Sequence, residues 1–353
     1  MALPSKATVK RAGQRASAAN SINDISNDDL EILDEWRRAH LTPLTAIAMW
    51  LRAPSQKATD QPPAQRLKRR ETFLDKLISG RAIDASSMQD LGGCRLIFKT
   101  LADLNEFREY LDNRSRAHHI LSHTPSKYDY ISAPKQTGYR GVHYVYKYAP
   151  TTDSRREFSG LKVEVQLRTA AQHAWATAVE ISDLVFGTRT KFEDGSGDNG
   201  EFFRLASELI ARRHEGMVSC CSELSFDEVA ERFLEIEKRV DILDRLAKLR
   251  EQGDFSRIKQ HTILAFMQDS TLEIFGYTKA KRAIDKEGEL LHDTRCANVV
   301  YVSASSPTAI RSSYRNYLTN PEDFVKLVKD ALQSRSDPDI NTDQSPRPTA
   351  RTS

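Results

Sequence analysis

Residues 162–169 read KVEVQLRT, a stretch in which charged or polar side chains alternate with apolar ones. In a β-strand this alternation places the two valines and the leucine on one face and the polar side chains on the other. Two more short runs, 94–98 and 142–148, are rich in apolar and aromatic residues and predict further strands of the same sheet. A helical pattern at 101–111 lies between those two runs. The sequence therefore predicts a mixed α+β domain and not a regular doubly wound one.

Helical spacing of apolar residues precedes and follows this sheet. The predicted helices lie at 27–51, where Pro43 introduces a kink or a break, and at 66–79, 169–185, 202–215 and 226–252. A proline-containing loop is predicted at 54–63 and a polar break at 191–199. A second β region is predicted from strands at 261–267, 271–275 and 298–304, with helices at 280–291, 307–317 and 321–332.

These elements divide the chain into five predicted parts. Residues 1–24 carry almost no large apolar side chains and residues 334–353 are polar, so both ends are predicted to be disordered. Residues 25–215 form the predicted α+β domain. Residues 216–254 form a helical connector, and residues 255–333 form a small α/β module without a motif that indicates chemistry.

The composition excludes several classes of protein. Apolar residues make up 39% of the 353 residues and charged residues 29%, which is typical of a globular chain with a packed core. The formal net charge is only +3, which gives no sign of a nucleic-acid-binding surface. No run approaches 18 apolar residues, the N-terminus lacks a secretory signal, and the four cysteines contain no CxxC pair. We therefore expect a cytoplasmic protein without a membrane span or a zinc ribbon.

A basic segment, RLKRRETFLDK at 66–76, is the first candidate for chemistry. On the predicted helix, Lys68, Thr72 and Lys76 are spaced by four residues and share one face. Two ammonium groups and a hydroxyl on one face suit a triphosphate. A solvated charged face is the commoner meaning of such a run, so the segment alone leaves both interpretations open.

Two acidic residues are the second candidate. Glu164 lies on the polar face of the strand at 162–169, and Asp90 shortly precedes the strand at 94–98. Magnesium is typically bound by one or two carboxylates together with substrate phosphates, so this pair is a candidate metal site. Each residue taken alone is more often a structural ion-pair partner.

A turn rich in tyrosine and basic residues, YDYISAPKQTGYRGVH at 128–143, is the third candidate. An exposed Tyr139 can stack on a nucleobase, while Lys135 and His143 can contact phosphate. The alternative is a turn whose tyrosines pack beneath it.

Together these segments resemble the synthetase domain of RelA/SpoT-type enzymes, which transfer pyrophosphate from ATP to the ribose 3′-hydroxyl of GDP or GTP. The matching positions are Arg66, Lys68, Thr72 in place of the family's serine, Lys76, Asp90, Gly93, Arg95, Lys135, Gly138, Tyr139, Arg140, His143 and residues 163–169. QHAWA at 172–176 resembles the helix that closes the domain, and the resemblance extends over roughly residues 30–215.

The resemblance implies a nucleotidyltransferase-like mixed sheet flanked by helices, and it implies a role for each matched residue. ATP would be bound by Arg66, Lys68, Thr72, Lys76 and Arg95, and the guanine nucleotide by Lys135, Tyr139, His143 and Gln166. Asp90 and Glu164 would hold Mg²⁺, and Glu164 would also accept the proton of the attacking hydroxyl. The product would be guanosine tetra- or pentaphosphate, the alarmone of the stringent response.

Other interpretations stay open at this level. Some small members of the family are toxins that modify the 3′ end of tRNA, and others accept adenine nucleotides. A non-catalytic nucleotide sensor with a degenerate fold is a third reading, although binding alone would not require both Asp90 and Glu164. The one His-Asp pair, His292–Asp293, has no companion ligands, so we predict no alarmone hydrolase domain. The oligomeric state is left open.

Overall fold

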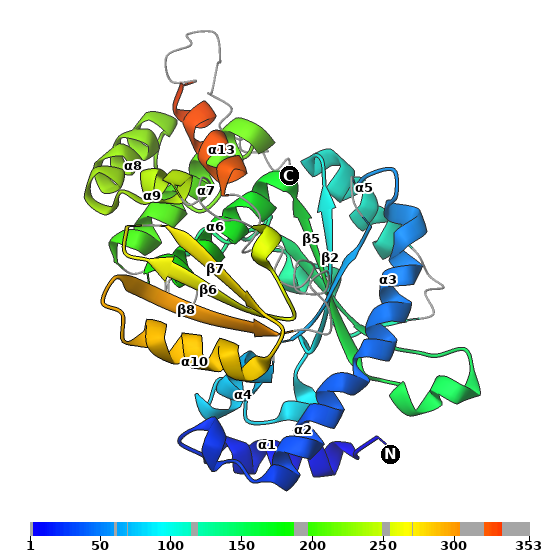
Figure 1. Cartoon of the computed structure of the whole chain (residues 1–353). Coiled ribbons are helices and arrows are strands. Elements are labelled where there is room, and N and C mark those ends of the chain that lie inside the picture. The colour runs from blue at the N-terminus through cyan, green and yellow to red at the C-terminus, as the bar shows by residue number, and fades with distance from the viewer. Residues whose placement is uncertain are drawn as a thin grey trace, which may run out of the picture. The chain divides into compact units, whose positions relative to one another are not determined.

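The computed structural model describes residues 3–59, 62–68, 70–113, 119–186, 197–248, 255–269, 271–303 and 321–333. The chain forms two compact units (Figure 1). The first comprises residues 1–133 and 140–170, and the second comprises residues 134–139 and 171–353. None of the helices in the described ranges combines the length and the apolar character needed to cross a membrane.

The first unit is built on a five-stranded mixed sheet in the order β1-β2-β5-β4-β3. The strands are β1 (Ala64–Leu67), β2 (Gly92–Phe98), β3 (Ile120–Leu121), β4 (Val142–Lys147) and β5 (Lys162–Thr169). β2 and β5 are parallel, and the other neighbours are antiparallel. This confirms the predicted mixed α+β fold.

β5 lies in the middle of the sheet, and its sequence explains why. Val163, Val165 and Leu167 are fully buried, whereas Glu164 and Gln166 lie on the opposite face and are partly accessible. Burial of three aliphatic side chains stabilises the strand by several kcal/mol, at roughly 1.5–3 kcal/mol each. The apolar face of β5 thus anchors the strand while its polar face remains available for chemistry.

The described residues of the first unit form five α-helices: α1 (Lys6–Ser17), α2 (Asn27–Ala39), α3 (Leu41–Ser55), α4 (Arg70–Ile78) and α5 (Leu101–Asp112). Short 3₁₀ turns lie at Ile22–Asp24, Ala85–Ser87, Pro125–Tyr128 and Asp153–Phe158. The predicted helix at 27–51 is divided at His40, and α3 continues through Pro54, into the segment predicted as a loop.

The predicted disorder of residues 1–24 is wrong for the described part of that segment. α1 buries Val9, Ala12 and Ala16 against the rest of the first unit. Gly13 allows this packing, because a Cβ atom at its position would lie 3.1 Å from the Ala85 Cβ. Small side chains can pack as closely as large ones, so the scarcity of large apolar residues was a misleading signal.

The predicted helix at 66–79 is also wrong at its start, before Arg70. Ala64–Leu67 pairs with β2 as an edge strand, and the helix α4 begins only at Arg70. Backbone pairing to a neighbouring strand outweighs the modest helix preference of charged residues, which is worth only tenths of a kcal/mol per residue.

The second unit combines helices with a three-stranded antiparallel sheet in the order β7-β6-β8. Its elements are α6 (Ala170–Phe186), α7 (Asp198–Glu215), α8 (Phe226–Val240), α9 (Ile242–Lys248), the 3₁₀ turn Phe255–Arg257, β6 (His261–Met267), β7 (Leu272–Tyr277), α10 (Ala280–Leu291), β8 (Cys296–Ser303) and α13 (Glu322–Gln333). α10 lies along the sheet (Figure 1).

The predicted boundaries at 215 and 255 do not coincide with the structure. One apolar core includes Phe202 and Phe203 of α7, Phe233 of α8, Phe266 of β6 and Phe324 of α13. The predicted connector helices are therefore part of the same core as the sheet. The predicted single helix at 226–252 breaks at Asp241, which has a left-handed backbone with φ of 53°.

The helix predicted at 307–317 and the tail predicted at 334–353 lie outside the described residues, as do most residues of the break predicted at 191–199.

Candidate functional site

Two lysines from different elements meet on one carboxylate. Lys68 lies in the loop after β1 and Lys76 lies on α4, yet Nζ of Lys68 and Nζ of Lys76 donate to Oδ2 of Asp90 at 2.8 and 3.1 Å. The sequence placed both lysines on one helix face, which is wrong for Lys68. The two lysines nevertheless converge, because Asp90 lies two residues before β2, the strand with which β1 pairs.

The electrostatics of this cluster are finely balanced. Burial alone would raise the pKa of Asp90, but the charges and hydrogen bonds of Lys68 and Lys76 outweigh it and hold that pKa below its ordinary value. Burial lowers the pKa of Lys68, and the nearby charges of Lys76 and Arg66 lower it further, against the opposing effect of Asp90. The cluster therefore concentrates positive charge that a single carboxylate only partly neutralises.

Glu164 presents a second carboxylate in the same unit. Its Oε1 lies 2.8 Å from His143 Nδ1, and its Oε2 accepts a hydrogen bond of 2.7 Å from Gln166 Nε2. Burial would raise the pKa of Glu164, but the hydrogen bonds from His143 and Gln166 keep it below the ordinary value, while the charge of Asp90 acts to raise it. The carboxylate is therefore ionised at neutral pH and close enough to Asp90 to sense its charge.

Strand register gathers several predicted residues on one face of the first sheet. Arg66 pairs with Gly93, which pairs with Glu164, and Arg95 pairs with Gln166, which pairs with His143. Residues paired across neighbouring strands point to the same side. The residues that share this face are Arg66, Arg95, His143, Glu164 and Gln166.

The donor set fits a divalent cation. Asp90 Oδ1 is buried and, among the described residues, has no hydrogen-bond partner. Each oxygen of Glu164 has one hydrogen-bonding partner in the described residues, which leaves it capacity for another interaction. Two ionised carboxylates with free lone pairs are the ligands that Mg²⁺ prefers.

Lys135 and Tyr139, predicted to contact the acceptor, lie in the second unit. The Lys135 ammonium lies 5.4 Å from the centre of the Tyr139 ring, and the edge of that ring meets Trp175 at 6.3 Å between centroids. Tyr139 is half-buried, so its ring is neither fully presented to solvent nor packed away completely. The ring of Tyr139 therefore matches neither an exposed stacking tyrosine nor a tyrosine packed fully beneath the turn.

α7 holds this turn through contacts that the sequence did not reveal. Ser207 Oγ donates a 2.6 Å hydrogen bond to the carbonyl of Gly138. Gly138 has a φ of +87°, and a Cβ atom there would lie 2.9 Å from the Ser207 Cβ and 3.1 Å from the Arg204 Cα. No spacing in the sequence links positions 69 residues apart.

Two other predicted residues have simpler surroundings. Thr72 is half-buried on α4, one turn before Lys76, and Arg66 is exposed on β1. The sequence also missed Arg37 of α2, which donates a hydrogen bond to the Lys68 carbonyl. A lone arginine among other charged residues on a helix gives no signal of such a contact.

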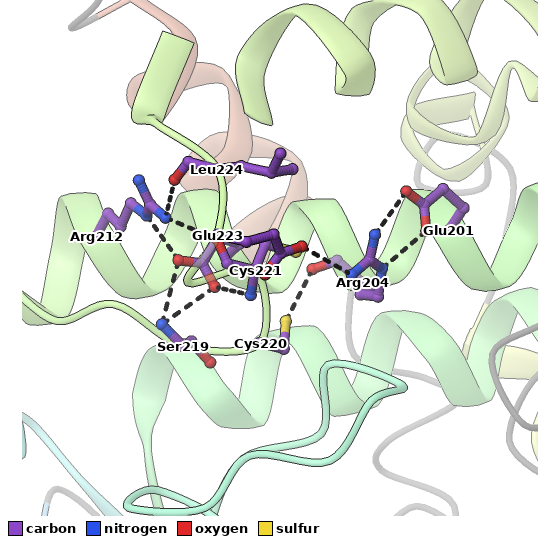
Figure 2. Close-up of polar contacts among 9 residues, drawn as sticks. Glu201, Arg204, Arg212, Ser219, Cys220, Cys221, Glu223 and Leu224 are labelled. Carbon is purple, nitrogen blue, oxygen red and sulfur yellow. Dashed lines mark hydrogen bonds and ion pairs between the residues drawn. The ribbon is translucent and has the colours of Figure 1, made fainter. Parts of the chain in front are cut away.

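A group of potential metal ligands in the second unit is better explained as a loop anchor. Glu208, Cys220 and Cys221 have ligand atoms within 4.8 Å of one another. However, the Glu208 carboxylate already accepts hydrogen bonds from Arg212 Nε and from the backbone N–H groups of Ser219 and Cys221 (Figure 2). These donors occupy its lone pairs, so it holds the loop after α7 and is poorly placed to bind a cation.

In a comparison with known proteins, residues 65–184 match the family model described as the region found in RelA/SpoT proteins. GTP pyrophosphokinase YwaC of Bacillus subtilis is 31% identical over 117 residues, which are 32% of this chain and 52% of that protein. GTP pyrophosphokinase YjbM of the same organism is 32% identical over 94 residues, which are 27% of this chain and 41% of that protein. The chain thus matches about half of the length of these curated relatives.

Two solved structures show a more distant likeness. Small alarmone synthetase 1 from Bacillus subtilis, bound to its product pppGpp, is 22% identical with a TM-score of 0.40, and the match covers 59% of this chain and 99% of that one. The same enzyme bound to AMPCPP is 16% identical with a TM-score of 0.33, covering 59% of this chain and 97% of that one.

Proposed function

We propose that the RelA/SpoT region of this chain, residues 65–184, transfers pyrophosphate from ATP to the 3′-hydroxyl of GDP or GTP. The new bond joins that oxygen to the β-phosphorus of ATP, the bond between the β-phosphorus and the oxygen of the α-phosphate breaks, and AMP leaves. The observation that carries the proposal is the Lys68–Asp90–Lys76 cluster, with Glu164 close enough to sense its charge. The names of the curated relatives, both GTP pyrophosphokinases, support it.

The lysines would bind the triphosphate of ATP. Lys68 and Lys76 share one carboxylate, so the cluster without nucleotide has one positive charge in excess. Their side chains are only 16% and 30% exposed, so this charge is screened less than on an open surface. An incoming triphosphate would complete the neutralisation, and positioning with charge neutralisation is the main contribution of a protein to phosphoryl-type transfer.

Asp90 and Glu164 would hold Mg²⁺. The cation would neutralise charge on the phosphate oxygens and help to orient them. Glu164 would also accept the proton of the attacking 3′-hydroxyl. Its lowered pKa keeps it ionised and therefore able to accept at neutral pH, and His143 and Gln166 fix the direction of its two oxygens.

Tyr139 would stack on the acceptor base. The Lys135 ammonium lies over that ring, so a nucleobase would take its place on the ring face, and the displaced ammonium would contact phosphate. Stacking of a base on an aromatic ring contributes roughly 1–3 kcal/mol.

The test is incubation of the full chain with labelled ATP, Mg²⁺ and, in separate reactions, GDP, GTP, ATP and tRNA. We expect a labelled guanosine tetra- or pentaphosphate and AMP. Glu164→Gln should abolish transfer, because it removes the charge at nearly constant volume, while Glu157→Gln is the matched control at an exposed position. Transfer to tRNA alone would refute the proposed acceptor, and wild-type turnover by Glu164→Gln would refute the role of Glu164.

A further inference from the structure

The backbone of Lys68 is fixed on both sides. Its N–H donates a 2.8 Å hydrogen bond to the carbonyl of Leu91, the residue next to Asp90. Its carbonyl accepts a 2.9 Å hydrogen bond from Nη1 of Arg37 on α2. Lys68 lies in a loop, where no helical ladder would otherwise hold these groups. The Arg37 contact therefore replaces the restraint that a regular element would supply.

One helical turn of α2 contacts the same segment twice. Asp34 Oδ2 accepts a 2.6 Å hydrogen bond from Arg70 Nε, and Asp34 Oδ1 lies 3.7 Å from Arg37 Nε. Arg37 thus holds the chain at Lys68, and Asp34 holds it two residues later, at Arg70. Their side chains are only 22% and 18% exposed, which limits screening of this ion pair by solvent.

We infer that Arg37, supported by Asp34, is a positioning residue that sets the place of the Lys68 ammonium for the triphosphate. This inference rests on the proposed role of Lys68 in binding ATP. A lysine side chain has four rotatable bonds, so its ammonium is placed only as well as its backbone is held. Arg37 acts through the Lys68 carbonyl and needs no contact with the nucleotide.

The experiment compares Arg37→Ala, Arg37→Lys and the control Arg38→Ala, whose side chain is exposed on the same helix. We expect Arg37→Ala to raise the KM for ATP about tenfold, equivalent to ~1.4 kcal/mol, with the KM for the acceptor changed less than twofold. Arg37→Lys keeps a donor and should restore part of the loss. Arg38→Ala should behave as wild type.

A purely structural role for Arg37 predicts a different result. Arg15→Gln breaks the ion pair with Asp29 near the start of α2 and leaves the Lys68 loop untouched, so it should lower Tm without changing the KM for ATP. The inference is overturned if Arg37→Ala behaves like Arg15→Gln, or if it raises both KM values equally.

Binding of AMPCPP, measured by calorimetry, separates this inference from the proposed function. Weaker binding to Arg37→Ala than to wild type supports the positioning role even if no acceptor is ever modified. Equal binding overturns it, whatever the outcome of the transfer assay.

Discussion

Asp90→Asn should lower stability and strengthen nucleotide binding in the absence of magnesium. The Asp90 carboxylate accepts hydrogen bonds from two ammonium groups at 2.8 and 3.1 Å. Hydrogen bonds to charged groups contribute roughly 1.5–3 kcal/mol, but an asparagine oxygen still accepts and the site is partly solvated, so we expect a loss of about 1–2 kcal/mol. At about 2–4 °C per kcal/mol, Tm should fall by about 2–8 °C.

The same substitution should strengthen the binding of AMPCPP, although it lowers the stability of the protein. Without the Asp90 charge, the two ammonium groups are free to pair with a triphosphate, so AMPCPP in the presence of a chelator should bind at least about threefold more tightly, as removal of a like charge a few ångströms away predicts. Transfer in Mg²⁺ should nevertheless be lost, because a proposed ligand of the cation is gone. Calorimetry with and without Mg²⁺ measures both effects.

The pH dependence gives a further check on Asp90. Its pKa in the folded protein is lowered, so near pH 4 the unfolded chain binds more protons than the folded one and stability rises with pH. The stabilisation is present above the unfolded pKa of roughly 3.9 and is lost as the pH falls through the folded pKa. Asp90→Asn should flatten this part of the stability curve.

Asp75→Asn is the matched control, since Asp75 pairs with Arg81 on the exposed side of α4 and its side chain is 58% exposed. It should leave AMPCPP binding unchanged and reduce stability less than Asp90→Asn. Unchanged stability of Asp90→Asn, together with weaker binding of magnesium-free AMPCPP, would refute the reasoning that the carboxylate competes with the nucleotide for the lysines.

The remaining predictions concern the two substrate sites. Lys76→Ala should raise the KM for ATP and leave binding of the guanine nucleotide unchanged; equal loss of both would indicate collapse of α4. Tyr139→Ala should raise the KM for the acceptor by one to two orders of magnitude, as loss of a stacked base of roughly 1–3 kcal/mol predicts, whereas Tyr139→Phe should be nearly silent; equal effects would exclude stacking. Gly138→Ala should lower Tm and raise the KM for the acceptor, because its Cβ would lie 2.9 Å from the Ser207 Cβ at a φ of +87°; an unchanged Tm would contradict this.

The sequence predicted the central strands well because their signal is local. The alternation of polar and apolar residues in KVEVQLRT predicts the two faces of β5 without information from any distant residue. β1 lacked such a signal. Its residues Ala64–Leu67 are mostly exposed, and Leu67 is their one large apolar side chain. Only the pairing with β2 therefore decides their conformation.

The candidate site shows the same division between local and distant information. Motifs were enough to select Lys68, Lys76, Asp90 and Glu164 as candidates. They could not show how the two lysines converge, because this depends on the position of Asp90 before β2. The contact of Arg37 with Lys68 spans 31 residues, which no periodic pattern records.

The attachment of Gly138 to Ser207 has a consequence for how the chain is synthesised. Residues 134–139 leave the ribosome well before α7, although they belong to the unit that α7 helps to build. The turn that carries Lys135 and Tyr139 therefore lacks this hydrogen bond until Ser207 has emerged. A fragment that ends at residue 184, the limit of the matched region, would contain every motif residue and still lack the partner of Gly138. Such a fragment should bind ATP with nearly the affinity of the full chain, but it should bind the acceptor more weakly than the full chain does.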